Sequence, residues 1–367
     1  MPATPFPPLP PLEVSPGPRL AEPLPAGRPV RWGILATGKI AGSFARALAL
    51  LPDAELAAVA SRTLSRAEEF ATSYGGRGTP RAYGSYAELV TDPEVDVVYV
   101  ASPHALHHEH TMLAFEAGKP VLCEKALTLT AREAEDLVRV ARERGLFFME
   151  AMWMRCNPVI RRVKQLADRG DLGRIQQVRA DLGFLVEAPE TDRLLAPELG
   201  VGALLDMGVY ALTFAHLFLG DPEKVEAVAE LSPGGIDLNL AVSLGWAGGA
   251  VASVSATMTA HSPRTASIAT DRGRIDLGEA FHHPTEATWT QDGEAHVIRE
   301  EVLGTGLAHE AAEVMRCLRS GEIESPLVPH DDSLAIMRLM DRIRGRIGLT
   351  YAADDLPDDR GATRVEA

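Results

Sequence analysis

Short apolar runs alternate with segments of helical spacing between residues 30 and 150. Some of these runs are continuously apolar, as expected of strands buried on both faces of a parallel sheet. The predicted strands are Arg31–Leu35, Glu55–Ala60, Val95–Ala101, Pro120–Cys123 and Leu146–Met149. The predicted helices between them are Ile40–Leu51, Ser65–Tyr74, Tyr86–Thr91, His107–Ala117 and Ala131–Arg144. This alternation predicts an α/β domain with a doubly wound parallel sheet.

The pattern changes after Pro158. Strands with period-two alternation follow, and Asp237–Trp246 shows it most clearly, with Ala250–Met258 repeating it more weakly. Such alternation indicates an antiparallel sheet with one apolar face. Helical spacing recurs at Val159–Ala167, from Gly208 through Leu219, at Ala308–Ser320 and at Asp332–Ile347. The second half is therefore predicted to be an α+β domain with an open, largely antiparallel sheet.

These patterns divide the chain into four parts. Residues 1–29 are rich in proline and lack hydrophobic periodicity, so we expect a disordered or extended arm rather than a signal peptide. Residues 30–150 are predicted to form a nucleotide-type domain, and residues 151–350 are predicted to form the α+β domain. Residues 351–367 are expected to be a charged tail.

Composition narrows the class of protein. The 367 residues carry a net charge of −15, which argues against nucleic acid and anionic membranes as partners. No apolar run approaches the length expected of a transmembrane helix. The three cysteines are far apart and odd in number, which predicts no disulfide framework and a reducing, cytoplasmic location.

The turn after the first strand has the sequence Ala36-Thr37-Gly38-Lys39-Ile40-Ala41. The dinucleotide fingerprint G-x-G-x-x-G/A occupies the same strand–turn–helix context. Here alanine replaces the first glycine, Gly38 supplies the second, and Ala41 stands at the third. We predict that this turn binds a pyrophosphate at a helix N-terminus, as in a Rossmann domain. The alternative is an ordinary tight turn.

The end of the second predicted strand bears on cofactor choice. NAD-specific sites usually have an acidic residue there that binds the ribose hydroxyls. This chain has Ser61 and Arg62, with Arg66 one turn later. A hydroxyl and a guanidinium suit a 2′-phosphate, so we favour NADP over NAD. The alternative is that Arg62 is an ordinary solvated surface residue.

Two titratable residues follow neighbouring predicted strands, His104 after one and Lys125 after the next. Ligands in open α/β sheets bind beyond the carboxyl ends of the strands, so both side chains are predicted in one crevice. His104 also begins a cluster with His107, His108 and His110. We predict no metal there, because the loop lies where a nicotinamide would sit. His104 and His107 are expected to line the pocket, and His108 and His110 to point outward.

Several motifs together resemble the Gfo/Idh/MocA oxidoreductases: ATGKIA, SPHALH, CEKA and LLDMGVY, in that order and spacing. The segments EAMWMRCNP and LLDMGVY are most similar to the dimeric dihydrodiol dehydrogenase and NADP-dependent xylose dehydrogenase branch. The resemblance covers residues 30 to about 350. It implies a Rossmann domain, a substrate domain with an open sheet, and a nicotinamide cofactor between them.

Lys125 matches the lysine of the family's E-K-P motif, and Tyr210 stands where many members have histidine. A cation near a phenol favours the phenolate, so Tyr210 is the candidate acid/base and Lys125 its electrostatic partner. Asp206, one helical turn before Tyr210, could orient the lysine or the substrate. The alternatives are a buried aromatic, a surface lysine and a helix-end carboxylate.

Other residues complete the predicted site. Ser102 and Glu124 are placed with the cofactor, beside His104, His107 and Lys125. Trp153 and Arg155 follow the last Rossmann strand and could wall a sugar or diol. Alternatively, Trp153 is a core residue and Arg155 belongs to a surface ion pair.

The chain departs from the family at Ala126, which replaces the proline of E-K-P. The resemblance implies a cis bond before that proline. A cis bond costs about 2.5–4 kcal/mol before a residue other than proline, so we predict a trans Lys125–Ala126 bond. Lys125 is still predicted to point into the crevice, because the preceding strand anchors Cys123 and Glu124.

The resulting hypothesis is an NADP(H)-dependent oxidoreductase that transfers hydride between nicotinamide and a carbinol or carbonyl of a sugar or cyclic diol. Two alternatives are a non-catalytic NADP-binding sensor and a sugar–sugar oxidoreductase with tightly bound NADP. A homodimer or homotetramer is predicted through the open sheet. Its outer face is expected to carry Asp237, Asn239, Ala241 and Ser243.

Overall fold

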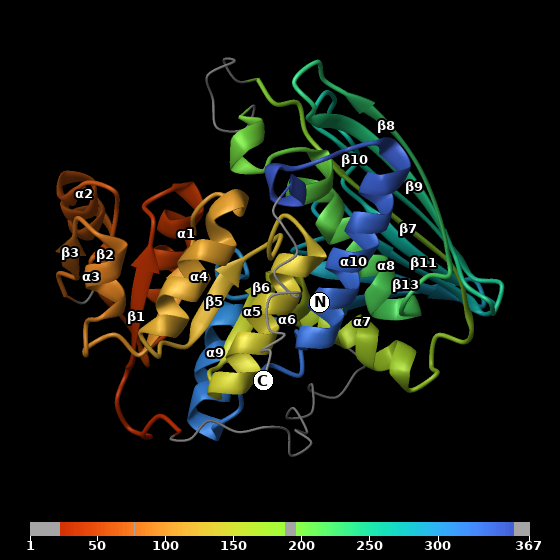
Figure 1. Cartoon of the computed structure of the whole chain (residues 1–367). Coiled ribbons are helices and arrows are strands. Elements are labelled where there is room, and N and C mark those ends of the chain that lie inside the picture. Colours follow the sequence, from red (N-terminus) through yellow and green to blue (C-terminus); the bar gives the residue numbers. More distant parts are fainter. Residues whose placement is uncertain (1–22, 77, 188–195, 356–367) are drawn as a thin grey trace, which may run out of the picture.

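The computed structural model describes residues 23–76, 78–187 and 196–355. Its first sheet has six parallel strands in the order β3-β2-β1-β4-β5-β6, the doubly wound arrangement predicted (Figure 1). The strands are β1 Val30–Leu35, β2 Ala54–Ala60, β3 Arg81–Tyr83, β4 Val97–Val100, β5 Val121–Glu124 and β6 Phe148–Ala151. Every residue of β4, β5 and β6 is buried, and this includes the charged residues Glu124 and Glu150. The strand β3 was not predicted, because three residues are too few to show a period.

Helices cover both faces of this sheet (Figure 1). They are α1 Lys39–Leu48, α2 Leu64–Tyr74, α3 Tyr86–Val90, α4 His107–Glu116 and α5 Ala131–Arg144. The bounds of α5 match the prediction because both of its ends carry local signals. Thr130 and Glu133 form a capping box, and Gly145 ends the helix in the left-handed conformation.

The second sheet has eight strands in the order β14-β13-β12-β11-β7-β10-β9-β8. All neighbours are antiparallel except β7 and β10, which run parallel. The strands are β7 Ile175–Gly183, β8 Lys224–Leu231, β9 Asp237–Gly245, β10 Val251–Thr257, β11 Ala266–Thr270, β12 Gly273–Leu277, β13 Glu286–Gln291 and β14 Glu294–Arg299. The fold is therefore the predicted α/β domain joined to an α+β domain.

Helices fill the space between the two sheets and return to the first domain (Figure 1). They are α6 Trp153–Cys156, α7 Pro158–Asp168, a π-helical turn Leu204–Gly208, α8 Val209–Leu219, α9 Leu307–Ser320 and α10 His330–Ile347. Helix α9 packs on α1, and α10 packs on α5, α8 and β8. The segment Pro197–Leu219 is long and apolar enough to span a membrane, contrary to the expectation that no run would be. Its apolar window is 83% buried inside the protein, as in a core helix.

The predicted face of β9 is correct except at its first residue. Asn239, Ala241 and Ser243 are exposed, but Asp237 is fully buried. The β8–β9 register shifts between Glu230 and Leu231, so the period-two parity does not extend to Asp237. Its Oδ2 accepts the N–H of Leu204 at 2.6 Å, and burial raises its pKa to about 7.

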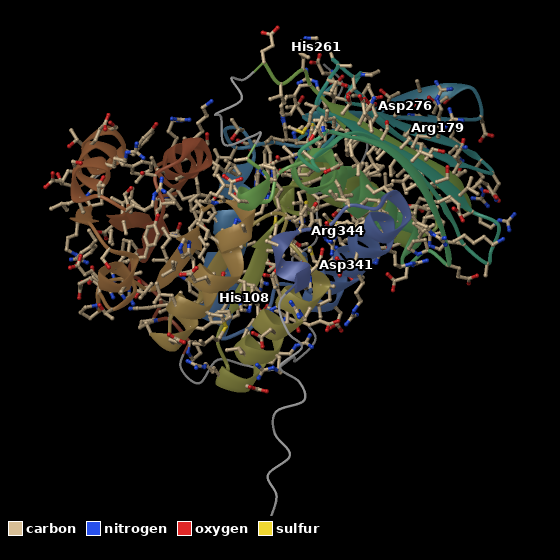
Figure 2. The ribbon with its side chains drawn as sticks, turned by 45° about the horizontal axis from the view of Figure 1, so that its top comes forward. His108, Arg179, His261, Asp276, Asp341 and Arg344 are labelled. Carbon is tan, nitrogen blue, oxygen red and sulfur yellow. The ribbon has the colours of Figure 1, made fainter. Side chains whose placement is uncertain are left out.

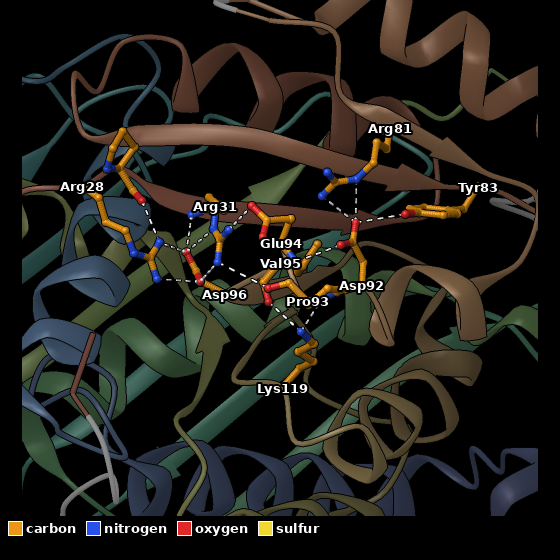
Figure 3. Close-up of polar contacts among 11 residues, drawn as sticks. Arg28, Arg31, Arg81, Tyr83, Asp92, Pro93, Glu94, Val95, Asp96 and Lys119 are labelled. Atoms are coloured by element: carbon orange, nitrogen blue, oxygen red, sulfur yellow. Dashed lines mark hydrogen bonds and ion pairs between the residues drawn. The ribbon is translucent and has the colours of Figure 1, made fainter. Parts of the chain in front are cut away.

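Most of the predicted Pro-rich arm lies outside the described residues, as does most of the predicted tail. The N–H of Leu24 donates to Leu318 O, and Arg28 forms an ion pair with Asp96 (Figure 3). At the other end, Tyr351 is buried against the Arg344 guanidinium.

Asp96 joins the N-terminal segment to the first sheet (Figure 3). Its carboxylate accepts hydrogen bonds from Arg28 at 2.6 and 2.9 Å and from Arg31 at 2.9 Å. Burial by itself would raise the pKa of Asp96, but the two guanidiniums lower it to about 2. A carboxylate with a lowered pKa stabilises the fold above its unfolded pKa near 4, and this contribution is lost as pH falls through about 2.

We therefore expect Asp96→Asn to lower the free energy of unfolding by about 2–3 kcal/mol at pH 7. The difference from the parent should shrink as pH falls from 4 to 2. Urea unfolding at several pH values measures both effects. Asp168→Asn is the control, because Asp168 is exposed and forms a surface ion pair with Lys164 one turn away. A loss at pH 7 that persists unchanged at low pH would contradict the assignment.

Candidate active site

A cleft of about 760 Å³ lies between the carboxyl ends of the parallel strands and the second domain. The Rossmann side contributes Lys39, His104 and Lys125, and the second domain contributes Asp206 and Tyr210. The two halves of the predicted site therefore face each other across the domain junction.

The turn formed by residues 36–41, called the glycine turn below, borders this cleft at the start of α1. Gly38 is the N-cap of α1, with no side-chain cap and no acidic residue in the first turn. A Cβ added to Gly38 would meet nothing within 4 Å, so the backbone N–H groups are open to a ligand. Ala36 adopts φ 80°, and Lys39 and Ile40 line the cleft. An open helix N-terminus with free N–H groups fits the pyrophosphate of a dinucleotide.

The residues predicted to select the cofactor lie beside this turn, at the end of β2. Ser61 is buried, and its Oγ lies 3.1 Å from Thr37 Oγ1. Arg62 and Arg66 are exposed and flank the start of α2. Within the described chain, neither guanidinium has a carboxylate within ion-pair distance. Both are therefore available to an anionic ligand.

The Lys125–Ala126 bond is cis, so the prediction of a trans bond was wrong. Contacts distant in the sequence hold the carbonyl groups on either side of it. His104 Nε2 lies 3.1 Å from Lys125 O, and His107 Nδ1 lies 2.9 Å from Ala126 O. Ala126 itself is fully buried. The residue type at position 126 could not reveal these contacts.

Lys125 points into the cleft, as predicted. Its Nζ donates to the main-chain oxygen of Asp206 at 3.0 Å and lies 4.0 Å from Asp206 Oδ1. It also lies 5.1 Å from the centroid of the Tyr210 ring. Glu124, the residue before it, is buried and accepts hydrogen bonds from Tyr99 Oη and from the N–H of Lys125. Burial raises the pKa of Glu124.

The four histidines differ from one another more than the sequence indicated. His104 and His107 line the cleft, but both ring nitrogens of each face main-chain carbonyl oxygens. One of these is Ser102 O, which lies 2.9 Å from His107 Nε2. The two rings therefore hold the loops that shape the cleft. Burial lowers the pKa of both.

His108 and His110 were predicted to point outward, which is wrong for His110. His108 is partly exposed on α4 and pairs with Asp136 at 2.9 Å (Figure 2). His110 is buried and packs edge-on against Tyr86 at 4.7 Å. It lies one turn after His107 and therefore shares that residue's inward face.

Asp206 enters the cleft from the π-helical turn, and Tyr210 enters it from the first turn of α8. Asp206 Oδ2 is buried without a hydrogen-bond partner in the described structure, and Oδ1 lies 3.9 Å from His104 Nε2. Tyr210 is buried, and its oxygen accepts the indole N–H of Trp153 at 2.6 Å. Just before this turn, the backbone of Gly202 packs tightly against Asp237. A Cβ at Gly202 would lie 1.9 Å from Asp237 Oδ1, so only glycine fits there.

The pKa of Tyr210 is opposite to the prediction. Burial raises it well above the ordinary value, and the nearby Glu124 carboxylate raises it further. The prediction rested on the Lys125 cation alone, because burial and the approach of Glu124 depend on the folded chain. Tyr210 is therefore a neutral phenol in this state of the chain.

Trp153 and Arg155 were predicted to lie together in the site, but their side chains point in different directions. Trp153 lines the cleft, but Arg155 turns away from it. The Arg155 guanidinium is buried and donates to Asp332 and Leu327 O, each at 2.6 Å. The structure therefore does not place Arg155 in the cleft with Trp153, and the alternative, an ion pair, describes its contacts.

A second group of residues, which was not predicted, also lines the cleft. His282 and His283 come from the loop between β12 and β13, and Phe184 follows β7. Burial lowers the pKa of His282 to about 3, so this ring is neutral. The His-His-Pro sequence was the only signal available, because the loop has no period.

Comparison with known proteins agrees with this geometry. A family model described as "Oxidoreductase family, NAD-binding Rossmann fold" matches residues 30–152, and the model of the family's C-terminal domain matches residues 160–276. The chain belongs to the Gfo/Idh/MocA oxidoreductase family. Among its relatives is the trans-1,2-dihydrobenzene-1,2-diol dehydrogenase of Mus musculus, 35% identical over 89% of this chain and 99% of that protein. The Homo sapiens enzyme of that name is also 35% identical, with the same coverage.

Solved structures also share this fold. The 3-ketoreductase KijD10 from Actinomadura kijaniata, in complex with NADP and TDP-benzene, is 30% identical with a TM-score of 0.78. The match covers 87% of this chain and 98% of that one. An aldose–aldose oxidoreductase from Caulobacter crescentus, at 23% identity and a TM-score of 0.79, shares the fold.

Proposed function

We propose that this family member is an NADP(H)-dependent oxidoreductase that interconverts a carbinol and a carbonyl on a sugar or cyclic diol. The observation that carries the proposal is one cleft in which Lys125 and Tyr210 meet from different domains, 5.1 Å from Nζ to ring centroid. The open glycine turn leads into the same cleft. The dihydrodiol dehydrogenase relatives and the NADP complex of KijD10 support the choice of substrate and cofactor.

The chain's own residues would bind the cofactor, transfer the proton and stabilise the developing charge, whereas the cofactor carries the hydride. A bound nicotinamide supplies a hydride donor or acceptor at carbon. The residues of the glycine turn, with Ser102, His104, His107 and Glu124, would hold and orient it. In reduction, Tyr210 donates its proton to the carbonyl oxygen, and Lys125 stabilises the negative charge that develops. In oxidation, Tyr210 must first be deprotonated, and its phenolate then takes the hydroxyl proton. The Lys125 cation and the positive charge that the oxidised nicotinamide would add both favour this phenolate. Asp206 holds Lys125 through its main-chain oxygen.

The test is an assay of purified protein with NADP⁺ and a panel of aldoses, polyols and trans-dihydrodiols. Free NADPH should accumulate, detected by its absorbance. A protein that binds NADP but turns over nothing would be the non-catalytic sensor instead. A protein that oxidises one sugar only while reducing another, without releasing NADPH, would be the sugar–sugar oxidoreductase.

The outer face of the large sheet supports assembly. Val228 on β8 is 71% exposed and lies beside Ala241 on β9, which pairs with Ser255 on β10. Further along the sheet, Ser267 pairs with Arg179 on one side and with Asp276 on the other, which makes a polar cross-strand row. Figure 2 shows Arg179 and Asp276 on this sheet. Small and apolar groups beside polar ones permit close contact with a second sheet.

We expect a homodimer or homotetramer through this face. Sedimentation velocity at micromolar concentration should give a particle of at least twice the 39.4 kDa chain mass. Ala241→Arg should convert it to monomer, because a buried unpaired charge would oppose the contact. Ser73→Arg on α2 is the matched control. A parent protein that sediments as a monomer would refute the prediction.

We also propose a cytoplasmic location. The three cysteines are buried and form no disulfide, which is consistent with a reducing compartment.

A further inference from the structure

The hydrogen bond between Trp153 and Tyr210 has a direction that the chemistry of its partners dictates. An indole nitrogen can only donate, whereas a phenol oxygen can donate and accept. At 2.6 Å, Trp153 Nε1–H must therefore donate, and Tyr210 must accept. The tyrosine proton cannot lie on this line and must point elsewhere. The remaining open side of the hydroxyl is the cleft that both residues line.

The Trp153 ring is held firmly enough to fix this geometry. The His283 ring stacks on it with a centroid distance of 5.2 Å and an interplanar angle of 17°. Gly306 lies against the ring as well, since a Cβ there would sit 3.3 Å from Trp153 Cζ3. The neutral His282 ring meets both Trp153, at 5.8 Å, and Tyr210, at 4.9 Å. The donor is therefore positioned before any substrate arrives.

We propose that Trp153 is the positioning residue of Tyr210, holding the phenol oxygen as an acceptor so that its proton is aimed at the substrate oxygen. This rests on the proposed function. In reduction, the tyrosine O–H bond breaks and a new O–H bond forms on the substrate. The electron pair left on the phenol oxygen is then stabilised by the indole N–H. In oxidation the same steps run in reverse.

This arrangement makes a prediction about pH. A hydrogen bond to the charged form of an acid lowers its pKa, and Trp153 acts on Tyr210 in this direction against burial. The other titratable groups that face or surround Tyr210 are Lys125, Glu124, Asp206, Glu310, His282 and Tyr99. None of them is changed by substituting Trp153.

The first experiment needs no activity. In a ¹⁵N–¹H spectrum of the full chain, the Trp153 indole signal is identified by its loss in Trp153→Phe. Tyr210→Phe should move that signal upfield, because the acceptor is gone, while the indole signals of Trp32, Trp246 and Trp289 stay in place. A Trp153 signal that does not respond to Tyr210→Phe would overturn the inference, whatever the substrate proves to be.

The second experiment measures the consequence. Trp153→Phe keeps an aromatic ring in the stack and removes the N–H. The apparent pKa of the tyrosine limb in the kcat profile for diol oxidation should rise by about 1–2 pH units. Trp246→Phe is the matched control, since it removes an indole N–H that donates to Gly220 O outside the cleft. A purely structural role would change KM or the melting temperature and leave the limb in place, which would overturn the inference. If Tyr210→Phe itself retained activity, the proposed function would fail instead, and the spectrum would still decide the hydrogen bond.

Discussion

Replacing Tyr210 with phenylalanine should lower kcat by about 10²–10⁴-fold, the usual contribution of a general acid–base group. The substitution keeps the ring, so its contacts with His282 and the Lys125 ammonium are preserved. It removes the hydroxyl that accepts from Trp153 and carries the proton. KM for the substrate should change far less than kcat, because the lost interaction is strongest in the transition state.

Steady-state kinetics in both directions and NADPH binding by fluorescence measure these effects together. NADP(H) should bind the variant as tightly as the parent, which separates a loss of chemistry from a loss of folding. Tyr351→Phe is the matched control, since Tyr351 is also buried but packs on Arg344 outside the cleft. If Tyr210→Phe kept most of the parent's kcat, the proton would have to pass through another group.

Much of the fold could be predicted because its signals are local. The buried strand β4 is a continuous apolar run, and α5 carries a capping box and a terminal glycine. A hydrophobic period does not predict a strand that is too short or one whose register shifts. The strand β3 is too short to show a period, and the register shift in β8–β9 turns Asp237 inward.

The candidate site divides in the same way. Lys125 and Asp206 could be placed because each follows a recognisable motif and both reach one cleft. The cis bond, the turn of Arg155 toward Asp332 and the approach of His282 depend on partners far along the chain. No local pattern encodes such contacts. The raised pKa of Tyr210 belongs with them, because burial is a property of the assembled domains.

Arg62→Asp should reverse the preference for NADP(H) over NAD(H). The parent has an exposed guanidinium and a buried hydroxyl, Ser61, at the end of β2, the position at which dinucleotide sites distinguish the two cofactors. Arginine can bind a 2′-phosphate through two hydrogen bonds at once. Removing a hydrogen bond to a charged group costs about 1.5–3 kcal/mol, so kcat/KM for NADP⁺ should fall about 10–100-fold.

The introduced carboxylate would also repel the 2′-phosphate but can accept hydrogen bonds from the ribose hydroxyls of NAD⁺, so kcat/KM for NAD⁺ should be unchanged or improved. Measuring kcat/KM for both cofactors at one substrate concentration gives the ratio directly. Arg272→Asp makes the same charge change in the exposed turn between β11 and β12. It controls for net charge and should leave the ratio unaltered. Equal kcat/KM for NADP⁺ and NAD⁺ in the parent would remove the basis for a 2′-phosphate site at Arg62. If Arg62→Asp lowered kcat/KM equally for both cofactors, Arg62 would instead stabilise the fold of the turn.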